Sequence, residues 1–190
     1  MSRFKPRRFE VFIVAGLIFG LCFVLFFAFE RARKNARQAT CLMNMKQIGL
    51  ATNQYVRDYD EKFPLAKSWH EDLMPYAKKE TVFHCPARVS YGYAFNGRIS
   101  RLSLGLIESI NGDDERDTTP MFFESSLQRD NVTDSGQSWP KQEIHPKGNA
   151  VVFTDGHAEL QMKKPLFRAF APLPKPKPQK KARKKLGRRP

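Results

Sequence analysis

Two histidines and an aspartate lie close together in the last strongly hydrophobic segment of the chain. The segment IHPKGNAVVFTDGHAEL covers residues 144–160 and contains His145, Asp155 and His157. Imidazole and carboxylate groups bind metal ions and exchange protons, so these residues are weak candidates for a metal site or a His-Asp catalytic pair. These three residues offer fewer oxygen ligands than calcium prefers and fewer His or Cys ligands than zinc prefers. No surrounding motif marks a nucleophile that a His-Asp pair could activate. We therefore predict no catalytic residue and no cofactor. A hydrogen bond near a sheet edge is the plainer role for His145.

A hairpin explains Asp155 and Gly156 without catalysis. Asp-Gly after the β-rich stretch 150–154 is typical of a two-residue turn, which needs positive φ. Such a turn sets Thr154 opposite His157. One face of the hairpin then carries Val151, Phe153, Ala158 and Leu160, and the other carries Val152, Thr154, His157 and Glu159. We expect the first, apolar face to cover a helix.

Two of the three cysteines are candidates for a covalent or metal link. Cys22 lies in an apolar run, so only Cys41 and Cys85 can pair. Outside the cytoplasm, a disulfide between them would close a loop of about 45 residues and contribute roughly 3–4 kcal/mol. Two buried thiols are the alternative. A zinc site made of Cys41, His84 and Cys85 lacks an obvious fourth ligand.

The apolar run itself predicts a membrane-spanning helix. Residues 11–29 contain no charge, and as a helix they extend roughly 28 Å, close to the ~30 Å hydrocarbon thickness of a bilayer. Good helix formers continue the run over 30–37, and no small-residue cleavage site follows, which disfavours a secreted protein with a removed signal. Basic residues flank the run equally on both sides, so charge alone does not set the orientation.

The helix should continue beyond the membrane with one apolar face. Its stripe recurs at spacings of three and four residues and consists of Cys41, Met45, Ile48, Thr52, Tyr55 and Tyr59. We expect this soluble half of the helix to cover residues 31–62 and to end before Pro64. A stripe of this kind needs a partner surface.

The stretch RARKNARQATCLMNMKQIGLATNQYVRDYDEKFP resembles the opening of type IV pilin-like proteins, or pseudopilins. The stretches SWHEDLMPYAKKETVFHCPA and SYGYAFN are similar to the same group. His145, nine residues, Asp155 and Gly156 match its His-x9-Asp-Gly motif. The resemblance covers roughly residues 9–162.

This resemblance implies an α+β, pilin-like fold, with a long N-terminal helix packed on a small antiparallel sheet. It implies a non-enzymatic structural or accessory subunit of a type II secretion or type IV pilus-like system. The helix would sit in the bacterial inner membrane, with a cytoplasmic N-terminus and an extracytoplasmic body. Partners would be lipid and other pilin-like subunits, and Glu10 would act in assembly.

The prepilin-type cleavage site departs from the family pattern. Lys5 and Pro6 stand where Gly and Phe are expected when Glu10 is aligned on the family's acidic position. An unprocessed, single-pass anchored binding protein is therefore the alternative.

Composition divides the chain into five segments. These are a basic segment 1–8, a transmembrane helix 9–30, a soluble helix 31–62, an α+β body 63–162 and a disordered Pro/Lys-rich tail 163–190. From residue 163 onward there are twelve basic residues and no acidic ones. The tail could hold a polyanion such as DNA, a wall polymer or lipid headgroups. Its candidate residues are Lys175, Lys177, Lys180, Lys181, Arg183, Lys184, Lys185, Arg188 and Arg189.

Overall fold

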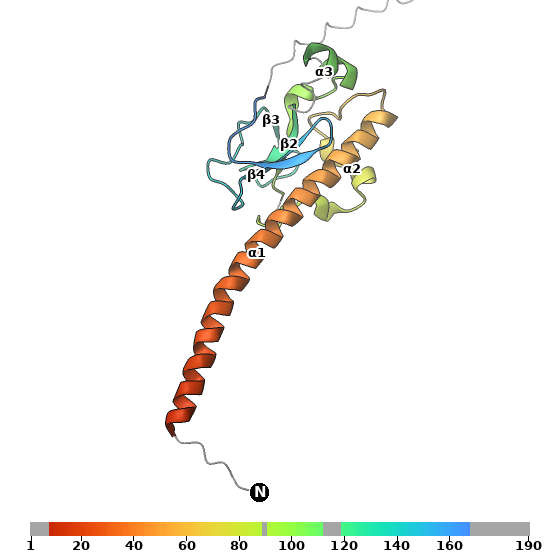
Figure 1. Ribbon diagram of the computed structural model, residues 1–190. Coiled ribbons are helices and arrows are strands. Elements are labelled where there is room, and N and C mark those ends of the chain that lie inside the picture. Colours follow the sequence, from red (N-terminus) through yellow and green to blue (C-terminus); the bar gives the residue numbers. More distant parts are fainter. Residues whose placement is uncertain (1–7, 89–90, 112–118, 168–190) are drawn as a thin grey trace, which may run out of the picture.

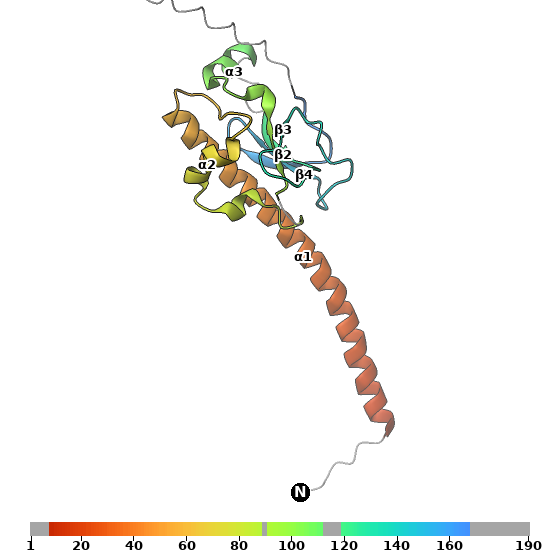
Figure 2. The ribbon, with the colours of Figure 1, turned by 180° about the vertical axis from the view of Figure 1, so that it is seen from behind.

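A computed structural model describes residues 8–88, 91–111 and 119–167 of the chain. Helix α1 (Arg8–Asp58) extends away from a small body that packs on its carboxyl-terminal half (Figure 1). The same arrangement is seen from behind in Figure 2. The other elements are α2 (Trp69–Ala77), η1 (Glu80–Phe83), β1 (Tyr93–Asn96), η2 (Gly97–Ile99), α3 (Leu104–Asn111), β2 (Pro120–Glu124), β3 (Thr133–Asp134), β4 (Asn149–Phe153) and β5 (Ala158–Gln161).

Helix α1 has two halves of opposite character. Its 51 residues extend roughly 77 Å at about 1.5 Å per residue. Every residue from Glu10 to Arg37 is exposed, whereas the expected stripe is fully buried from Cys41 to Thr52. The stripe weakens towards the end of the helix, where Tyr59 is 53% exposed. The sequence therefore predicted correctly a long helix of which only the second half is covered by protein.

The sheet is mixed rather than purely antiparallel. Its five strands follow the order β3-β1-β2-β4-β5. The pairs β1–β2, β2–β4 and β4–β5 are antiparallel, but the edge strand β3 runs parallel to β1. The fold is α+β, as the sequence predicted, with a connection between β2 and β3 that returns the chain to the far edge of the sheet.

The hairpin β4–β5 differs from the expected register by one residue. Val152 pairs with Ala158, not with Glu159. The turn holds three residues instead of two: the N–H of Gly156 donates to Phe153 O (2.9 Å), and the N–H of Phe153 donates to His157 O (3.0 Å). Gly156 has φ +92°, which fits a tight turn closed by a glycine bulge.

The shifted register changes which hairpin face covers the helix. One buried core joins the stripe of α1 to Ala150 and Val152, with Ala158 and Leu160 packed against it. Val151 and Phe153 lie in a second core on the other face of the sheet. The expected assignment of Val151 and Phe153 to the helix side was wrong, because one extra turn residue shifts β4 by one position relative to β5, and Ala158 and Leu160 alone keep the expected side.

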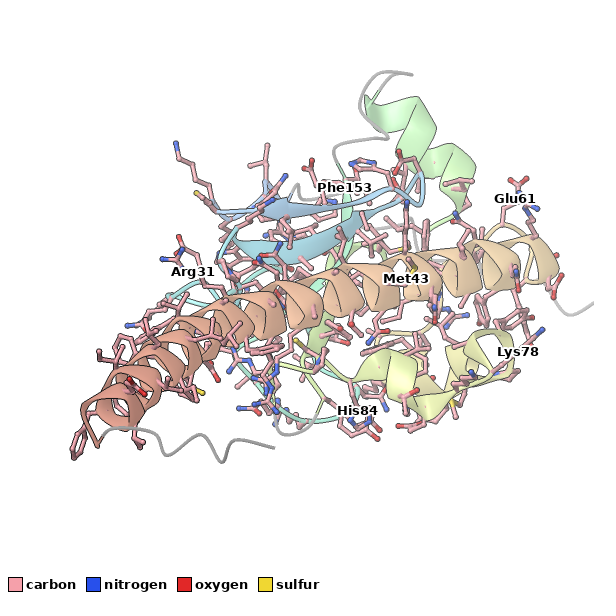
Figure 3. The ribbon with its side chains drawn as sticks, turned by 60° about the horizontal axis from the view of Figure 1, so that its bottom comes forward. Arg31, Met43, Glu61, Lys78, His84 and Phe153 are labelled. Atoms are coloured by element: carbon pink, nitrogen blue, oxygen red, sulfur yellow. The ribbon has the colours of Figure 1, made fainter. Side chains whose placement is uncertain are left out.

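Helix α1 lies between the sheet and α2, as Figure 3 shows with Phe153 on the sheet side and His84 on the opposite side. Trp69 on α2 is 2% exposed and its ring packs 5.0 Å from that of Phe122 on β2. The indole N–H donates to Val132 O at 3.1 Å.

The second core extends to Phe167, which is 8% exposed and packs on Phe123, so the body reaches beyond the expected boundary at residue 162.

Gly49 marks the closest approach of α1 to the sheet. A Cβ at this position would lie 2.7 Å from Cγ2 of the buried Val152. Because a valine side chain is stiff and this one is enclosed, the clash should cost about 1–3 kcal/mol, against a helix-propensity gain of about 1 kcal/mol. We expect Gly49→Ala to lower the free energy of unfolding by up to about 2 kcal/mol in urea denaturation.

Gly105 provides the matched control for this substitution. A Cβ at Gly105 in α3 meets nothing within 4 Å. Gly105→Ala should therefore leave stability unchanged or raise it by up to about 1 kcal/mol. Equal effects of the two substitutions would contradict the close packing of α1 on β4.

Candidate functional site

Four side chains that can bind metal ions converge in the core between α1 and the sheet. Cys41, Cys85, Glu124 and His145 are all buried, and their ligand atoms lie within 4.8 Å of one another. Oε1 of Glu124 is at the centre of the group. It lies 2.9 Å from Cys41 Sγ, 3.3 Å from Cys85 Sγ and 2.9 Å from His145 Nε2. Cys85 Sγ and His145 Nε2 are 3.5 Å apart. We call these four residues the buried cluster.

Each member of the buried cluster comes from a different element. Cys41 lies on α1, Cys85 follows η1, Glu124 ends β2 and His145 precedes β4. Two hydrogen bonds tie the loops of the cluster to α1. Asn44 donates from Nδ2 to His84 O at 2.9 Å, and the N–H of Lys147 donates to Gln38 Oε1 at 3.1 Å.

Two further groups orient the cluster from outside. The hydroxyl of Tyr93 lies 3.2 Å from Cys41 Sγ, and Tyr93 is 1% exposed. The N–H of Ala150 donates to Glu124 Oε2 at 2.8 Å. Since Oε2 is held in this way, Oε1 is the carboxylate oxygen directed at the two sulfurs and the imidazole.

Burial and hydrogen bonding shift the pKa values of the cluster residues in different directions. Burial raises the pKa of the Cys41 thiol. The hydrogen bond with Cys41 lowers the pKa of Cys85 to about 6, and His145 acts in the same direction. Burial lowers the pKa of His145, but its hydrogen bonds with Cys85 and Glu124 outweigh that effect and raise the pKa to about 9. Near neutral pH the arrangement favours a thiol at Cys41 and a Cys85 thiolate beside a protonated His145.

The structure regroups the residues that the sequence singled out. His145 lies in the buried cluster and not with Asp155 and His157. Those two residues form their own exposed pair at the hairpin turn, with 2.7 Å between Asp155 Oδ2 and His157 Nδ1. His84 is also outside the cluster and lies 3.6 Å from Glu80 Oε1.

Sequence reasoning missed Glu124 and Tyr93. The available signal for Glu124 was a carboxylate directly after the apolar strand residues Met121-Phe122-Phe123. A fully buried acidic residue needs partners, which would have connected it to the unassigned His145. In the structure Cys41 and Cys85 are free thiols, and the expected disulfide between them stays a prediction.

The segment from His145 to Gly156 approaches α1 at two points. Its His145 contacts Cys41 through the cluster. At its other end a Cβ on Gly156 would lie 2.9 Å from Asn53 Nδ2. The nine residues between His145 and Asp155 contain β4, so their number sets the length of chain between these two points.

A second group of potential ligands lies at the surface. Within the described ranges, His70, Glu71 and Asp130 also bring ligand atoms together, but Glu71 and Asp130 are exposed. His70 already has Asp130 Oδ1 at 3.1 Å and Glu80 Oε1 at 3.2 Å. This group is adequately explained as a surface charge network.

The apolar half of α1 is the other candidate functional surface. Its large hydrophobic side chains between Val11 and Phe29 are 44–75% exposed. By length and composition, α1 is the one helix in the described part of the chain that could cross a membrane. Glu10 lies at its start. The proposed polyanion-binding residues, from Lys175 to Arg189, and the cleavage-site positions Lys5 and Pro6 lie outside the described residues.

The chain is thus an α+β protein in which a membrane-length helix carries a compact body. Residues 30–70 match a family model described as a protein of unknown function (DUF1559). The match covers the junction between the exposed and the buried half of α1 and the segment after it. No curated protein and no solved structure shows significant similarity to the chain.

Proposed function

We propose that this protein is a membrane-anchored, pilin-like structural or accessory subunit of a type II secretion or type IV pilus-like system, and that it is not an enzyme. The helix would lie in the bacterial inner membrane, with its amino terminus in the cytoplasm and the body outside. Other pilin-like subunits would bind along the same helix.

One observation carries this proposal: a single continuous helix is exposed and apolar in its first half and packs one face against a folded body in its second half. A soluble protein would have to expose 19 consecutive uncharged residues to water, at a cost of roughly 25 cal/mol per Å² of apolar surface. Lipid or the apolar helices of neighbouring subunits remove that cost. The pilin-like sequence resemblance and the match over residues 30–70 support the same assignment.

A second candidate is an unprocessed, permanently anchored binding protein whose basic tail holds a polyanion. Lys5 and Pro6, in place of the Gly and Phe of a prepilin-type site, favour it. In that case no cleavage near Lys5 and Pro6 would generate a free amine close to Glu10, and pairing with the Glu10 of a neighbouring subunit would lack its partner.

The intact mass of the protein purified from membranes distinguishes the two candidates. We expect the loss of five or six amino-terminal residues if the chain is processed for assembly. A full-length amino terminus would favour the anchored binding protein. Protease accessibility of the tail in intact cells tests the proposed orientation.

Glu10 gives a direct test of assembly through the helix. Co-purification of two differently tagged copies in mild detergent should be lost in Glu10→Ala, because a carboxylate in an apolar surface needs a cationic partner. Glu30→Ala, at the other end of the apolar run, is the matched control and should co-purify as the wild type does. If wild-type copies do not co-purify at all, the subunit role is wrong.

A further inference from the structure

We propose that the buried cluster is a structural metal site that binds one Zn²⁺ through Cys41, Cys85, Glu124 and His145. The site would fasten the membrane-bearing helix to the sheet. The proposed filament role does not require such a site. The zinc site and the filament role are therefore independent proposals, and each is tested by its own experiment.

The first argument is the convergence of donors from four separate segments. Two thiols, an imidazole and a carboxylate meet with all four residues between 0% and 3% exposed. Charged and strongly polar groups are rarely buried unless they are paired or bind a metal. Thiolate and imidazole ligands are those that zinc selects, and a four-ligand set without an open position is typical of structural zinc.

The second argument is distance. With Zn–S of about 2.3 Å and Zn–N or Zn–O of about 2.0–2.1 Å, ligand atoms in a tetrahedron lie about 3.3–3.8 Å apart. The observed 3.5 Å between Cys85 Sγ and His145 Nε2 already fits. The 2.9 Å distances from Glu124 Oε1 to Cys41 Sγ and to His145 Nε2 are short by about half an ångström. A small withdrawal of one carboxylate oxygen therefore opens the site.

The third argument is charge balance. Zinc binds cysteine as the thiolate, so the thiol protons leave to solvent as the ion enters. The two thiolates and the Glu124 carboxylate then offset the charge of Zn²⁺, and no oxidant or reductant is needed. The hydroxyl of Tyr93 and the N–H of Ala150 remain as outer partners that hold a sulfur and the second carboxylate oxygen.

Two other states of the cluster compete with a zinc site. A Cys41–Cys85 disulfide would use two of the four donors and leave Glu124 and His145 as a buried pair. A purely hydrogen-bonded cluster would use all four without an ion. Both competing states are outcomes of the experiment below.

The experiment uses the full-length protein in detergent. Zinc measured by elemental analysis should be about one per chain. Protein stripped with a chelator and reduced should take up one equivalent of added Zn²⁺, with loss of thiol reactivity at Cys41 and Cys85. Added Co²⁺ should give the visible bands of a tetrahedral site and a thiolate charge-transfer band. If the reduced protein takes up neither Zn²⁺ nor Co²⁺, the proposal is wrong. This holds whether the protein as isolated carries a mapped Cys41–Cys85 disulfide or two free thiols.

Matched substitutions test the ligand assignment. Because loss of an outer partner costs about 10–100-fold in metal affinity, loss of a ligand in Cys85→Ser or His145→Gln should cost at least about 100-fold. Cys22→Ser and His157→Gln change the same residue types outside the cluster and should bind as the wild type does. Equal binding by Cys85→Ser and Cys22→Ser would overturn the assignment. Tyr93→Phe keeps all four ligands and should shift the cobalt charge-transfer band.

Discussion

Replacing Glu124 with leucine should cost roughly 3–5 kcal/mol of unfolding free energy even when no metal is present. The carboxylate is 0% exposed and is the common partner of Cys41, Cys85 and His145. Its loss removes the carboxylate acceptor of Cys41, of His145 and of the N–H of Ala150, and each buried group left without its partner costs about 1–3 kcal/mol. Urea denaturation with chelator and reductant present, followed by tryptophan fluorescence, measures the effect.

A double-mutant cycle separates the polar network from simple packing. Glu124→Leu combined with His145→Leu removes the acceptor and its principal donor together, so it should cost about 1–3 kcal/mol less than the sum of the single changes. The exposed pair Lys62–Asp60, 3.4 Å apart, supplies the control. Lys62→Leu should change stability by no more than about 0.5 kcal/mol. Additive effects of Glu124→Leu and His145→Leu would contradict the network.

The helix could be predicted from the sequence because its signals are local. The uncharged run of residues 11–29 indicates the half that could span a membrane. Apolar residues spaced three and four positions apart indicate the buried stripe from Cys41 to Thr52. Such patterns depend on residues within a few turns of one another, so no knowledge of the rest of the fold was needed.

The sheet and the buried cluster depend on contacts far apart in the chain. The pairing of β3 with β1 in parallel, and the extra residue in the β4–β5 turn, follow from tertiary packing that period-two patterns do not encode. Cys41 and Glu124 are 83 residues apart, and no spacing rule joins them. Cys41, Cys85 and His145 were singled out by residue type, but their meeting point and the fourth partner required the three-dimensional structure.

The position of the cluster relates the two halves of the molecule. Cys41 lies on α1 shortly after the exposed apolar half ends at Phe29. Any force that the membrane or a neighbouring subunit exerts on the helix would pass to the body through the first covered turn of α1, which contains Gln38 and Cys41. A cluster that joins α1 to η1, β2 and β4 would resist separation of helix and sheet there, which a loosely packed apolar contact would do less well.

Two arginines in the apolar half of α1 should abolish membrane integration. Leu17 and Leu21 are 69% and 61% exposed and lie one turn apart near the middle of the run. An arginine at the centre of a spanning helix costs about 2.5–3.5 kcal/mol, so Leu17→Arg with Leu21→Arg should cost roughly 5–7 kcal/mol. We expect this variant to be released by alkaline carbonate or degraded, whereas the wild type stays in the membrane pellet.

The same helix provides the control for this prediction. Met43 and Leu50 are 55% and 57% exposed on the half that carries the body. Met43→Arg with Leu50→Arg adds the same charge to the same helix, but in water, where exposed substitutions change stability by no more than about 0.5 kcal/mol. That variant should remain in the membrane pellet. If both pairs behave alike, hydrocarbon does not surround residues 11–29, and the apolar half must be covered by protein instead.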